Sequence, residues 1–433
     1  MFKFGLVKSD SISIVKLLVC FVLVVSTTHA FSRDAKELFD QYSDRIFQIR
    51  IIELSSGNQT AIGSGFQIDT DGFIVTNFHV VSEYVHHPEK YRIDLVTEHQ
   101  EHLDLELFNI DVVNDLALLK VEGSTTNGIE LADKLPLNGE PIFSLGNPHD
   151  LDLTVIPGTF NGVTSHSTYE RIHISAAINS GMSGGPTLNS AGQVVGVNVA
   201  SSGNQIGFLI PLHRLRSFVN RANESAITHE EYSETIRDQL YNNQSDFFNE
   251  LIDGDWVTSS FGDANVPDDI SPYIKCWGVN NSRPEEKYNY SASYCQENER
   301  IFLSGAFDTG SVLFQFGWFD TQQLNQFQFY KVLESYASDL RAENRSDEEN
   351  VTNFKCYDDF VESVSKANKS IENKVSYCAR TYKKYPGLYD VMYLSVSVHD
   401  NNKALLSHFS ITGVSQEAAA KLTKKFSENI IWN

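Results

Sequence analysis

Basic residues are scarce in this chain, which has 34 lysines and arginines against 56 aspartates and glutamates in 433 residues. The formal net charge is −22 at pH 7. A surface this negative repels phosphate groups, which argues against nucleic acid or an anionic membrane as a partner. The C-x-x-C spacing of zinc sites is also absent, so neither a metal nor a cofactor is predicted.

Long hydrophobic runs are missing too, except for one near the amino terminus. Met1–Ala30 resembles a secretory signal peptide, with three lysines before the apolar run Leu17–Val25 and small residues at Thr28–Ala30 for cleavage before Phe31. The run is short for a membrane span, although an uncleaved anchor is the alternative. We therefore predict an exported protein, periplasmic or secreted, without stable membrane insertion after signal cleavage.

Four cysteines remain after the signal segment: Cys276, Cys295, Cys356 and Cys378. An even number in an exported protein indicates two disulfides. Local pairing, Cys276–Cys295 and Cys356–Cys378, closes two loops of similar length. A metal site is the alternative, and the missing C-x-x-C spacing disfavours it.

The most informative motif is the stretch Gly181-Met182-Ser183-Gly184-Gly185, which places a serine between glycines. Glycines allow a sharp turn that exposes the serine Oγ, and they remove Cβ atoms from the path of a substrate carbonyl. The residues that follow have the pattern of a hairpin, which places Ser183 directly before a strand. The motif is consistent with a nucleophilic serine.

A serine hydroxyl needs a base and a carboxylate before it can attack an amide. His79 follows an apolar strand pattern, and Asp115 directly precedes another. Asp111 is the alternative carboxylate, but it lies within an alternating strand and is expected to face solvent. The three candidates thus occur in the order His79, Asp115, Ser183.

Six strings in this order resemble the trypsin-like serine proteases, specifically the HtrA/DegP-like branch. They are Gly63-Ser64-Gly65-Phe66, Thr76-Asn77-Phe78-His79-Val80, Asn114-Asp115-Leu116-Ala117-Leu118, Leu145-Gly146-Asn147-Pro148, Ala176–Pro186 and Gly207-Phe208-Leu209-Ile210-Pro211. The resemblance extends from about Ile62 to Ala222, less than half of the chain. No segment after Ala222 shows the glycine loop of the PDZ modules that such proteases usually carry.

The resemblance implies a role for each site residue. His79 would be the general base, Asp115 would orient it, Ser183 would be the nucleophile, and the N–H groups of Gly181 and Ser183 would form the oxyanion hole. Met182 stands where asparagine is common, but only its backbone is needed there. The primary pocket would be formed by Ala177, Val199, Ala200 and Ser201. It has no carboxylate, so we expect small or medium apolar side chains to be favoured.

The predicted fold class is an all-β double β-barrel, trypsin-like, followed by an α+β region with a duplicated disulfide-containing unit. Short apolar strands with Gly, Asn and Asp turns support the two barrels. They are Arg45–Leu54, Arg92–Thr97, Leu103–Val112, Leu153–Phe160, Arg171–Ala177 and Val194–Val199. Helices are expected at Ser32–Tyr42 and Pro211–Ala222.

The carboxyl-terminal half suggests an internal duplication. Ile274-Lys275-Cys276-Trp277 matches Phe354-Lys355-Cys356-Tyr357, and Ser293-Tyr294-Cys295 matches Ser376-Tyr377-Cys378 at a similar offset. A third landmark pairs Phe316–Asp320 with Ser395–Asp400. Two unrelated cysteine hairpins are the alternative. Each unit is expected to end in a helix, Phe329–Arg341 and Gln416–Ser427.

An acidic amphipathic helix is predicted within Thr228–Asp255, where apolar residues recur at helical spacing. A loop is expected at Asp263–Pro272, which contains two prolines. The predicted domains are a signal peptide, a trypsin-like protease domain, an acidic helical linker and two repeat units. Their boundaries are 1–30, 31–222, 223–268, 269–345 and 346–433.

We interpret the chain as an exported serine endopeptidase that acts on polypeptides. The resemblance implies unfolded or damaged proteins as substrates, and also a homo-oligomer, for which the residues themselves give no sign. The alternative is a latent or inactive protease-fold scaffold whose repeats bind a protein partner. A third possibility is that the repeats restrain the protease or recruit its substrate. Trp277, Trp318 and Phe319 are then the candidate contacts, although core packing is the commoner role of aromatic side chains.

Overall fold

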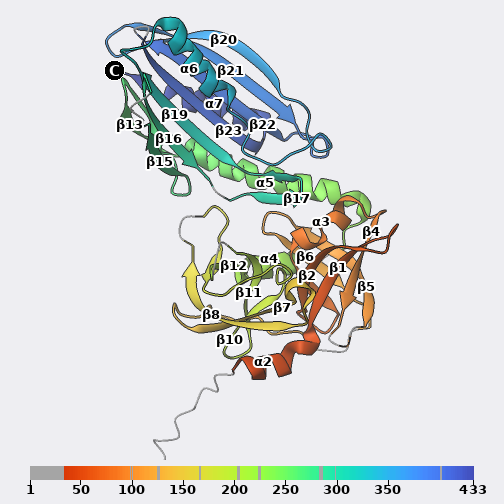
Figure 1. Cartoon of the computed structure of the whole chain (residues 1–433). Coiled ribbons are helices and arrows are strands. Elements are labelled where there is room, and N and C mark those ends of the chain that lie inside the picture. The colour runs from red at the N-terminus through yellow and green to blue at the C-terminus, as the bar shows by residue number, and fades with distance from the viewer. Residues whose placement is uncertain are drawn as a thin grey trace, which may run out of the picture.

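The computed structural model describes residues 34–433, apart from 98, 100, 124–126, 165–166, 202–204, 223–225, 282–285, 298 and 400–401. The predicted signal peptide Met1–Ala30 lies outside the described residues. The chain forms two lobes, with the amino-terminal half in one and the carboxyl-terminal half in the other (Figure 1). No helix in the described part is long and apolar enough to cross a membrane.

The first barrel is a closed sheet of six antiparallel strands in the order β1-β2-β3-β6-β5-β4. Its strands are β1 (Ile46–Glu53), β2 (Gln59–Gln67), β3 (Phe73–Thr76), β4 (Tyr91–Val96), β5 (His102–Asp111) and β6 (Leu116–Lys120). Alternating apolar residues along these strands fill the interior, as side chains on successive strand positions face opposite sides.

The second barrel is also closed, in the order β10-β11-β12-β9-β8-β7. Its strands are β7 (Pro141–Gly146), β8 (Thr154–Val163), β9 (Ile172–Ile174), β10 (Pro186–Asn189), β11 (Val194–Ser201) and β12 (Gly207–Pro211). The prediction of two six-stranded barrels is therefore confirmed. One apolar cluster fills this barrel and continues to Phe66, Val75 and Leu118 of the first, so the barrels pack as one body.

Three α-helices accompany the barrels: α2 (Ala35–Tyr42), α3 (Phe78–His86) and α4 (Leu212–Ala222). Short 3₁₀ turns lie at Ser43–Arg45 and Pro148–Asp150. Helices α2 and α4 agree with the sequence expectations to within a few residues. Helix α3 was not expected, because three of its nine residues are β-branched valines that follow directly on a strand pattern. It is stabilised by burying Val81 and Val85 in the core.

Asp111 is a correction to the sequence interpretation. Asp111 is only 3% exposed, whereas the strand pattern predicted a carboxylate that faces solvent. Arg221 of α4 donates to it at 2.9 Å, and the backbone N–H and side-chain amide of Asn114 donate at 3.0 and 2.9 Å. The carboxylate is tolerated inside because these donors satisfy it, a compensation that local periodicity cannot reveal.

Helix α5 (Tyr232–Asp253) leads from the barrels to the second lobe and lies along its base (Figure 1). It begins after a 3₁₀ turn, His229–Glu231. Thr228, which precedes this turn, forms a capping box with Glu231. The predicted apolar face is buried, including Ile236, Leu240 and Leu251. The amphipathic helix is thus present.

The second lobe is built on a seven-stranded antiparallel sheet in the order β15-β16-β19-β23-β22-β21-β20. Its strands are β15 (Lys275–Asn280), β16 (Asn289–Gln296), β19 (Val312–Asp320), β20 (Lys355–Val364), β21 (Ser370–Thr381), β22 (Tyr389–His399) and β23 (Lys403–Val414). Helices α6 (Gln326–Ser338) and α7 (Gln416–Glu428) follow β19 and β23 and pack in separate apolar clusters on the sheet. The predicted α+β region is confirmed.

The two predicted repeat units join in this single sheet, with β19 paired to β23 at its centre. Each unit carries its disulfide in the outermost pair of strands and ends in a helix. The strand before the helix is β19 in one unit and β23 in the other, whereas the third sequence landmark aligned β19 with β22. That landmark therefore does not lie on equivalent strands.

Smaller strands complete the lobe: β13 (Val257–Phe261), β14 (Ala264–Asp269), β17 (Ile301–Ser304), β18 (Phe307–Thr309) and β24 (Ile431–Trp432). The loop expected at Asp263–Pro272 is thus wrong, because β14 lies there. Strand β24 pairs only with Ala264 and Asn265, so at Pro267 strand β14 is paired with β13 alone, an edge position at which proline is tolerated.

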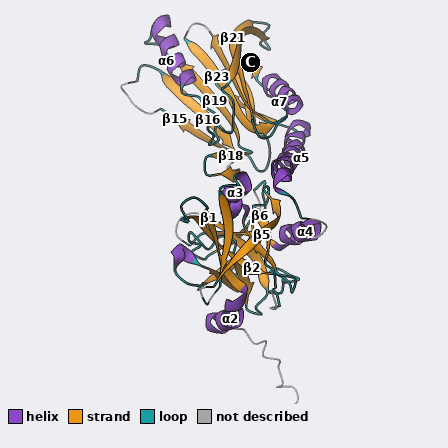
Figure 2. Cartoon of the chain, turned by 90° about the vertical axis from the view of Figure 1, so that its right-hand side faces the viewer, coloured by secondary structure: helices purple, strands orange, loops and turns teal. Residues whose placement is uncertain are grey.

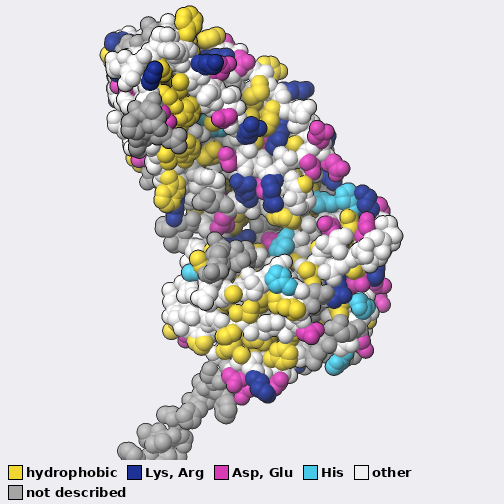
Figure 3. Space-filling model, viewed as in Figure 1, with side chains coloured by type: hydrophobic (Ala, Val, Ile, Leu, Met, Phe, Trp, Pro, Cys, Tyr) yellow, Lys and Arg dark blue, Asp and Glu magenta, His cyan; other side chains and the backbone are white. Residues whose placement is uncertain are grey.

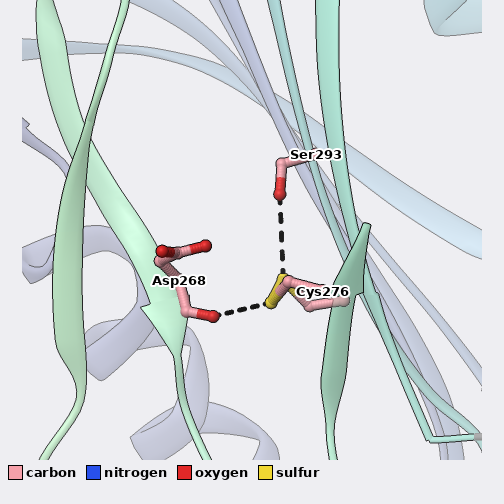
Figure 4. Close-up of a disulfide and its surroundings, with 4 residues drawn as sticks. Asp268, Cys276 and Ser293 are labelled. Carbon is pink, nitrogen blue, oxygen red and sulfur yellow. Dashed lines mark hydrogen bonds between the residues drawn. A yellow bond between two sulfur atoms is a disulfide. The ribbon is translucent and has the colours of Figure 1, made fainter. Parts of the chain in front are cut away.

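Both disulfides join neighbouring strands directly. Cys276 pairs with Cys295 across β15 and β16, and Cys356 pairs with Cys378 across β20 and β21. Figure 4 shows the first, where the Asp268 carbonyl oxygen lies 2.7 Å from Cys276 Sγ. A disulfide sulfur has no proton, so this is a close sulfur–oxygen contact. Cys295 is fully buried in the core of the sheet.

The three aromatic residues predicted as partner contacts have different environments. Phe319 is fully buried, Trp318 packs against the core, and Trp277 is exposed. Of the three, Trp277 is the most exposed, at 65%.

A continuous apolar cluster joins the first barrel to the second lobe. It contains Val81 and Val85 of α3, Ile236 of α5, and Ile301 and Leu303 of β17. Figure 2 shows α3, α5 and β18 meeting at the junction of the lobes. The lobes therefore share part of their hydrophobic core rather than being joined only by a linker.

Candidate active site

The pairing of β3 with β6 brings His79 and Asp115 to one edge of the first barrel. Thr76, the last residue of β3, lies opposite Ala117 of β6. The chain leaves β3 and turns into α3, so His79 lies just beyond this edge. Asp115 enters β6 at the same edge, with a positive φ of 58°. Asn77 donates its side-chain N–H to the Asp115 carbonyl at 2.8 Å and ties the two segments together.

Asp115 contacts His79 through both carboxylate oxygens. Oδ2 lies 2.7 Å from the ring Nδ1, and Oδ1 accepts the His79 backbone N–H at 2.9 Å. Because a carboxylate accepts, Nδ1 carries a proton and Nε2 is free to act as a base. Burial lowers the pKa of His79, but the charge and hydrogen bond of Asp115 outweigh it, so the pKa is raised above 6.5.

Ser183 lies in the loop between β9 and β10, at the same edge. The adjacent Gly184 packs so tightly against the residues before His79 that a Cβ on it would lie 2.4 Å from Thr76 Oγ1 and 3.0 Å from the Asn77 nitrogen. Ser183 Oγ donates to the Val199 carbonyl at 3.4 Å and not to His79. The Ser183–Val199 hydrogen bond is long. In enzymes without substrate, the hydrogen bond between a catalytic hydroxyl and its imidazole base is often not yet formed at full strength, and it tightens when substrate binds.

Gly181 has a backbone conformation that residues with a side chain rarely adopt. Its φ is +92°, and a Cβ there would lie 2.4 Å from the Asn147 carbonyl oxygen. The Ser180 carbonyl accepts the His149 N–H at 3.0 Å. In a trans peptide the C=O and N–H point in opposite directions, so the Gly181 N–H is directed away from His149. Neither this N–H nor that of Ser183 donates to an acceptor within the described residues.

Ser64 of β2 is a site residue that sequence reasoning missed. Its Oγ donates to the Gly181 carbonyl at 2.7 Å and accepts the Asn147 N–H at 2.8 Å, while its backbone N–H donates to the Ser183 carbonyl at 2.8 Å. Ser64 therefore holds the loop between β9 and β10 that carries Ser183, called here the nucleophile loop, from the opposite barrel. Its place between glycines in Gly63-Ser64-Gly65 was the available signal.

The predicted pocket residues are placed only in part. Ala177 is exposed, and Val199 is largely buried with its carbonyl directed at Ser183. Ala200 and Ser201 belong to β11, but their side chains lie outside the described residues. No group of three or more His, Cys, Asp or Glu residues that could hold a metal ion occurs in the part of the chain that the structure describes.

Comparison with known proteins defines the class of this domain. Residues 63–197 match the family model of the trypsin-like peptidase domain. Together with the two closed six-stranded barrels, this match identifies the amino-terminal lobe as a trypsin-like peptidase domain. Within that class the chain is similar to the HtrA/DegP-like proteases, as the sequence motifs predicted.

Two relatives and one solved structure illustrate the similarity. The chain is 35% identical over 178 residues to a probable periplasmic serine endoprotease, DegP-like, of Bartonella henselae, covering 39% of this chain and 34% of that protein. It is 32% identical over 191 residues to the chloroplastic Protease Do-like 5 of Arabidopsis thaliana, covering 38% and 59%. The crystal structure of the serine endoprotease from Yersinia pestis aligns with a TM-score of 0.39 and 23% identity, covering 44% and 66%. The chain thus spans less than two thirds of either of these relatives.

Proposed function

We propose that this protein is an exported serine endopeptidase that hydrolyses peptide bonds of unfolded or damaged polypeptides. The observation that carries the proposal is the double contact of Asp115 with His79, at the edge where the Ser183 loop packs. The similarity to proteases named serine endoproteases supports the reaction class. The predicted signal peptide, and a relative named periplasmic, support export.

The first half of the reaction forms an acyl-enzyme. Ser183 Oγ attacks the scissile carbonyl carbon while His79 Nε2 takes its proton. The carbonyl oxygen becomes an oxyanion, and the N–H groups of Gly181 and Ser183 stabilise it. His79, now protonated at both nitrogens, is stabilised by Asp115 and passes a proton to the leaving amine.

The second half releases the acyl group. Water takes the place of the amine, His79 removes its proton, and the resulting hydroxide attacks the ester. The tetrahedral intermediate collapses, Ser183 regains its proton from His79, and the carboxylic acid leaves. In this scheme the raised pKa of His79 makes it a stronger base than a free imidazole.

The test is cleavage of reduced casein by the full-length mature chain, with Ser183→Ala and His79→Ala as variants. We expect serine- and histidine-dependent fragments, with mapped cut sites after small or medium apolar residues. Ser335→Ala changes an exposed serine of α6 and is the matched control. No cleavage by the wild-type protein would favour the scaffold alternative.

A further inference from the structure

The segment that follows β16, together with β17 itself, contacts both barrels. Thr168 of the second barrel donates its hydroxyl to Glu297 Oε2 at 2.6 Å, and Ser167 donates to Glu299. On the first barrel, His86 Nε2 lies 2.8 Å from the Leu303 carbonyl oxygen. The second lobe is thus attached on both sides of the region that holds the candidate active site.

Strand β17 runs beside the face of α3 that carries His79. His79 and His86 are two helical turns apart and therefore share this face. Burial lowers the pKa of His86 to about 4, which keeps the ring neutral, so Nε2 donates to the carbonyl of Leu303. Figure 3 shows histidine side chains gathered at the junction of the lobes.

The side chain of Phe302 lies between the shared core and His79. Ile301 and Leu303 are 1% and 0% exposed in the apolar cluster that joins the lobes. Phe302, between them, is only partly buried and packs at the border of the same cluster. Its ring centroid is 6.0 Å from that of His79, with the ring planes at 76°.

We propose that Phe302 is a specificity-determining residue of the protease cleft, supplied by the second lobe. It forms an apolar wall for the substrate side chain that lies beside the His79 imidazole. This inference rests on the proposed function. Because the scissile bond must reach both Ser183 and His79, a side chain flanking that bond lies next to the ring and meets Phe302.

The chemistry of this wall selects apolar side chains. A phenyl ring offers a charged group no hydrogen bond, so a carboxylate placed against it loses hydration without compensation. We therefore expect Val, Leu, Ile, Met or Phe at this substrate position, and exclusion of Asp and Glu.

The experiment is substrate profiling of the full chain with a peptide library, comparing wild type, Phe302→Ala and Phe302→Leu. In Phe302→Ala, kcat/KM for the preferred peptides should fall on the order of 10-fold, through KM, with selectivity lost at one position within two residues of the scissile bond. Phe302→Leu should keep most of the kcat/KM and of the selectivity, because leucine is also apolar. Phe327→Ala, which truncates an 86% exposed phenylalanine of α6, should match wild type.

Two outcomes would overturn the proposal. One is a wild-type profile in Phe302→Ala, and the other is a uniform loss at all positions, which would mean that Phe302 only supports the fold. If the wild-type protein cleaves nothing, the proposed function fails separately. Binding of labelled casein peptides to Ser183→Ala, with and without Phe302→Ala, then decides the subsite, and equal binding would contradict it.

Discussion

Asp115 holds His79 at two points, the ring Nδ1 and the backbone N–H, with one carboxylate oxygen on each. The backbone contact fixes the start of α3, and the ring contact fixes the tautomer and direction of the imidazole. One side chain therefore sets both the position and the protonation of the proposed base.

Replacing Asp115 with asparagine should lower kcat on the order of 10⁴-fold, because an amide favours the wrong tautomer of His79. The pH midpoint of the residual kcat/KM should move to lower pH. Asp115 is what raises the pKa of His79, and the burial that lowers it remains. The measurement is a pH–rate profile of casein cleavage.

Asp111→Asn is the control for this experiment, since it also removes a buried carboxylate charge close in sequence. Asp111 accepts from Arg221 and Asn114, and not from His79. Its replacement should reduce the free energy of unfolding and leave kcat within a few-fold of wild type. A loss equal to that of Asp115→Asn would contradict the assignment.

Gly181→Ala should abolish most activity while the protein stays folded. The new Cβ would lie 2.4 Å from the Asn147 carbonyl oxygen, so the loop must shift and its N–H leaves the oxyanion position. A loss in kcat on the order of 10²-fold is expected for one such donor. Gly57→Ala is matched, with φ +71° but no atom within 4 Å of the added Cβ. It should cost about 1 kcal/mol of stability and no activity; equal effects on kcat would refute the steric argument.

Ser64→Ala should reduce kcat by roughly 10-fold, because a hydrogen bond to the nucleophile loop disappears. The change in KM should be smaller. The Gly181 carbonyl and the Asn147 N–H both lose their partner, a cost of about 1–3 kcal/mol in the free energy of unfolding. Ser410→Ala also removes a buried hydroxyl, but one without a partner in the described part of the chain. Ser410→Ala should change neither kcat nor the free energy of unfolding much. Steady-state kinetics and urea unfolding measure the two quantities.

The second lobe should lose stability in mild acid through His408. The residue is 1% exposed, its Nδ1 donates to the Tyr393 carbonyl, and burial lowers its pKa to about 4. The folded state therefore binds fewer protons than the unfolded state, in which the pKa is near 6.5. The contribution of neutral His408 to the free energy of unfolding is fully present above pH 6.5 and is lost as the pH falls toward 4. The loss is about 2 kcal/mol by pH 5.

Urea unfolding of the second lobe at pH 7 and pH 5 measures this effect. The fall in unfolding free energy between the two pH values should be about 2 kcal/mol smaller in His408→Leu than in wild type. His99→Leu, at an exposed position, should leave the fall unchanged. An unchanged fall in His408→Leu would show that another group causes the acid sensitivity.

Most elements that carry the candidate site follow local rules. Alternating apolar residues predicted β3, β6 and the hairpin after Ser183, and the order of His79, Asp115 and Ser183 predicted the chemistry. The acidic helix α5 likewise followed from its 3.6-residue apolar period. These features depend on residues close together in the chain, so their pattern is visible without the fold.

The errors lie where a distant partner overrides a local pattern. Asp111 is buried because Arg221, from a later helix, reaches it. Pro267 is accommodated in β14 because β24, from the end of the chain, pairs with Ala264 and Asn265 and leaves Pro267 at an edge. Neither partner could be located before the chain was folded.

The sequence by itself determined the class of the first lobe, the candidate catalytic residues and the cysteines available for pairing, because short motifs encode them. Only the tertiary structure decided that Ser64 holds the nucleophile loop across 117 residues, and that the second lobe places Phe302 beside His79. Such contacts arise when barrels and sheets pack to bury their apolar faces, and no local pattern specifies which surfaces meet.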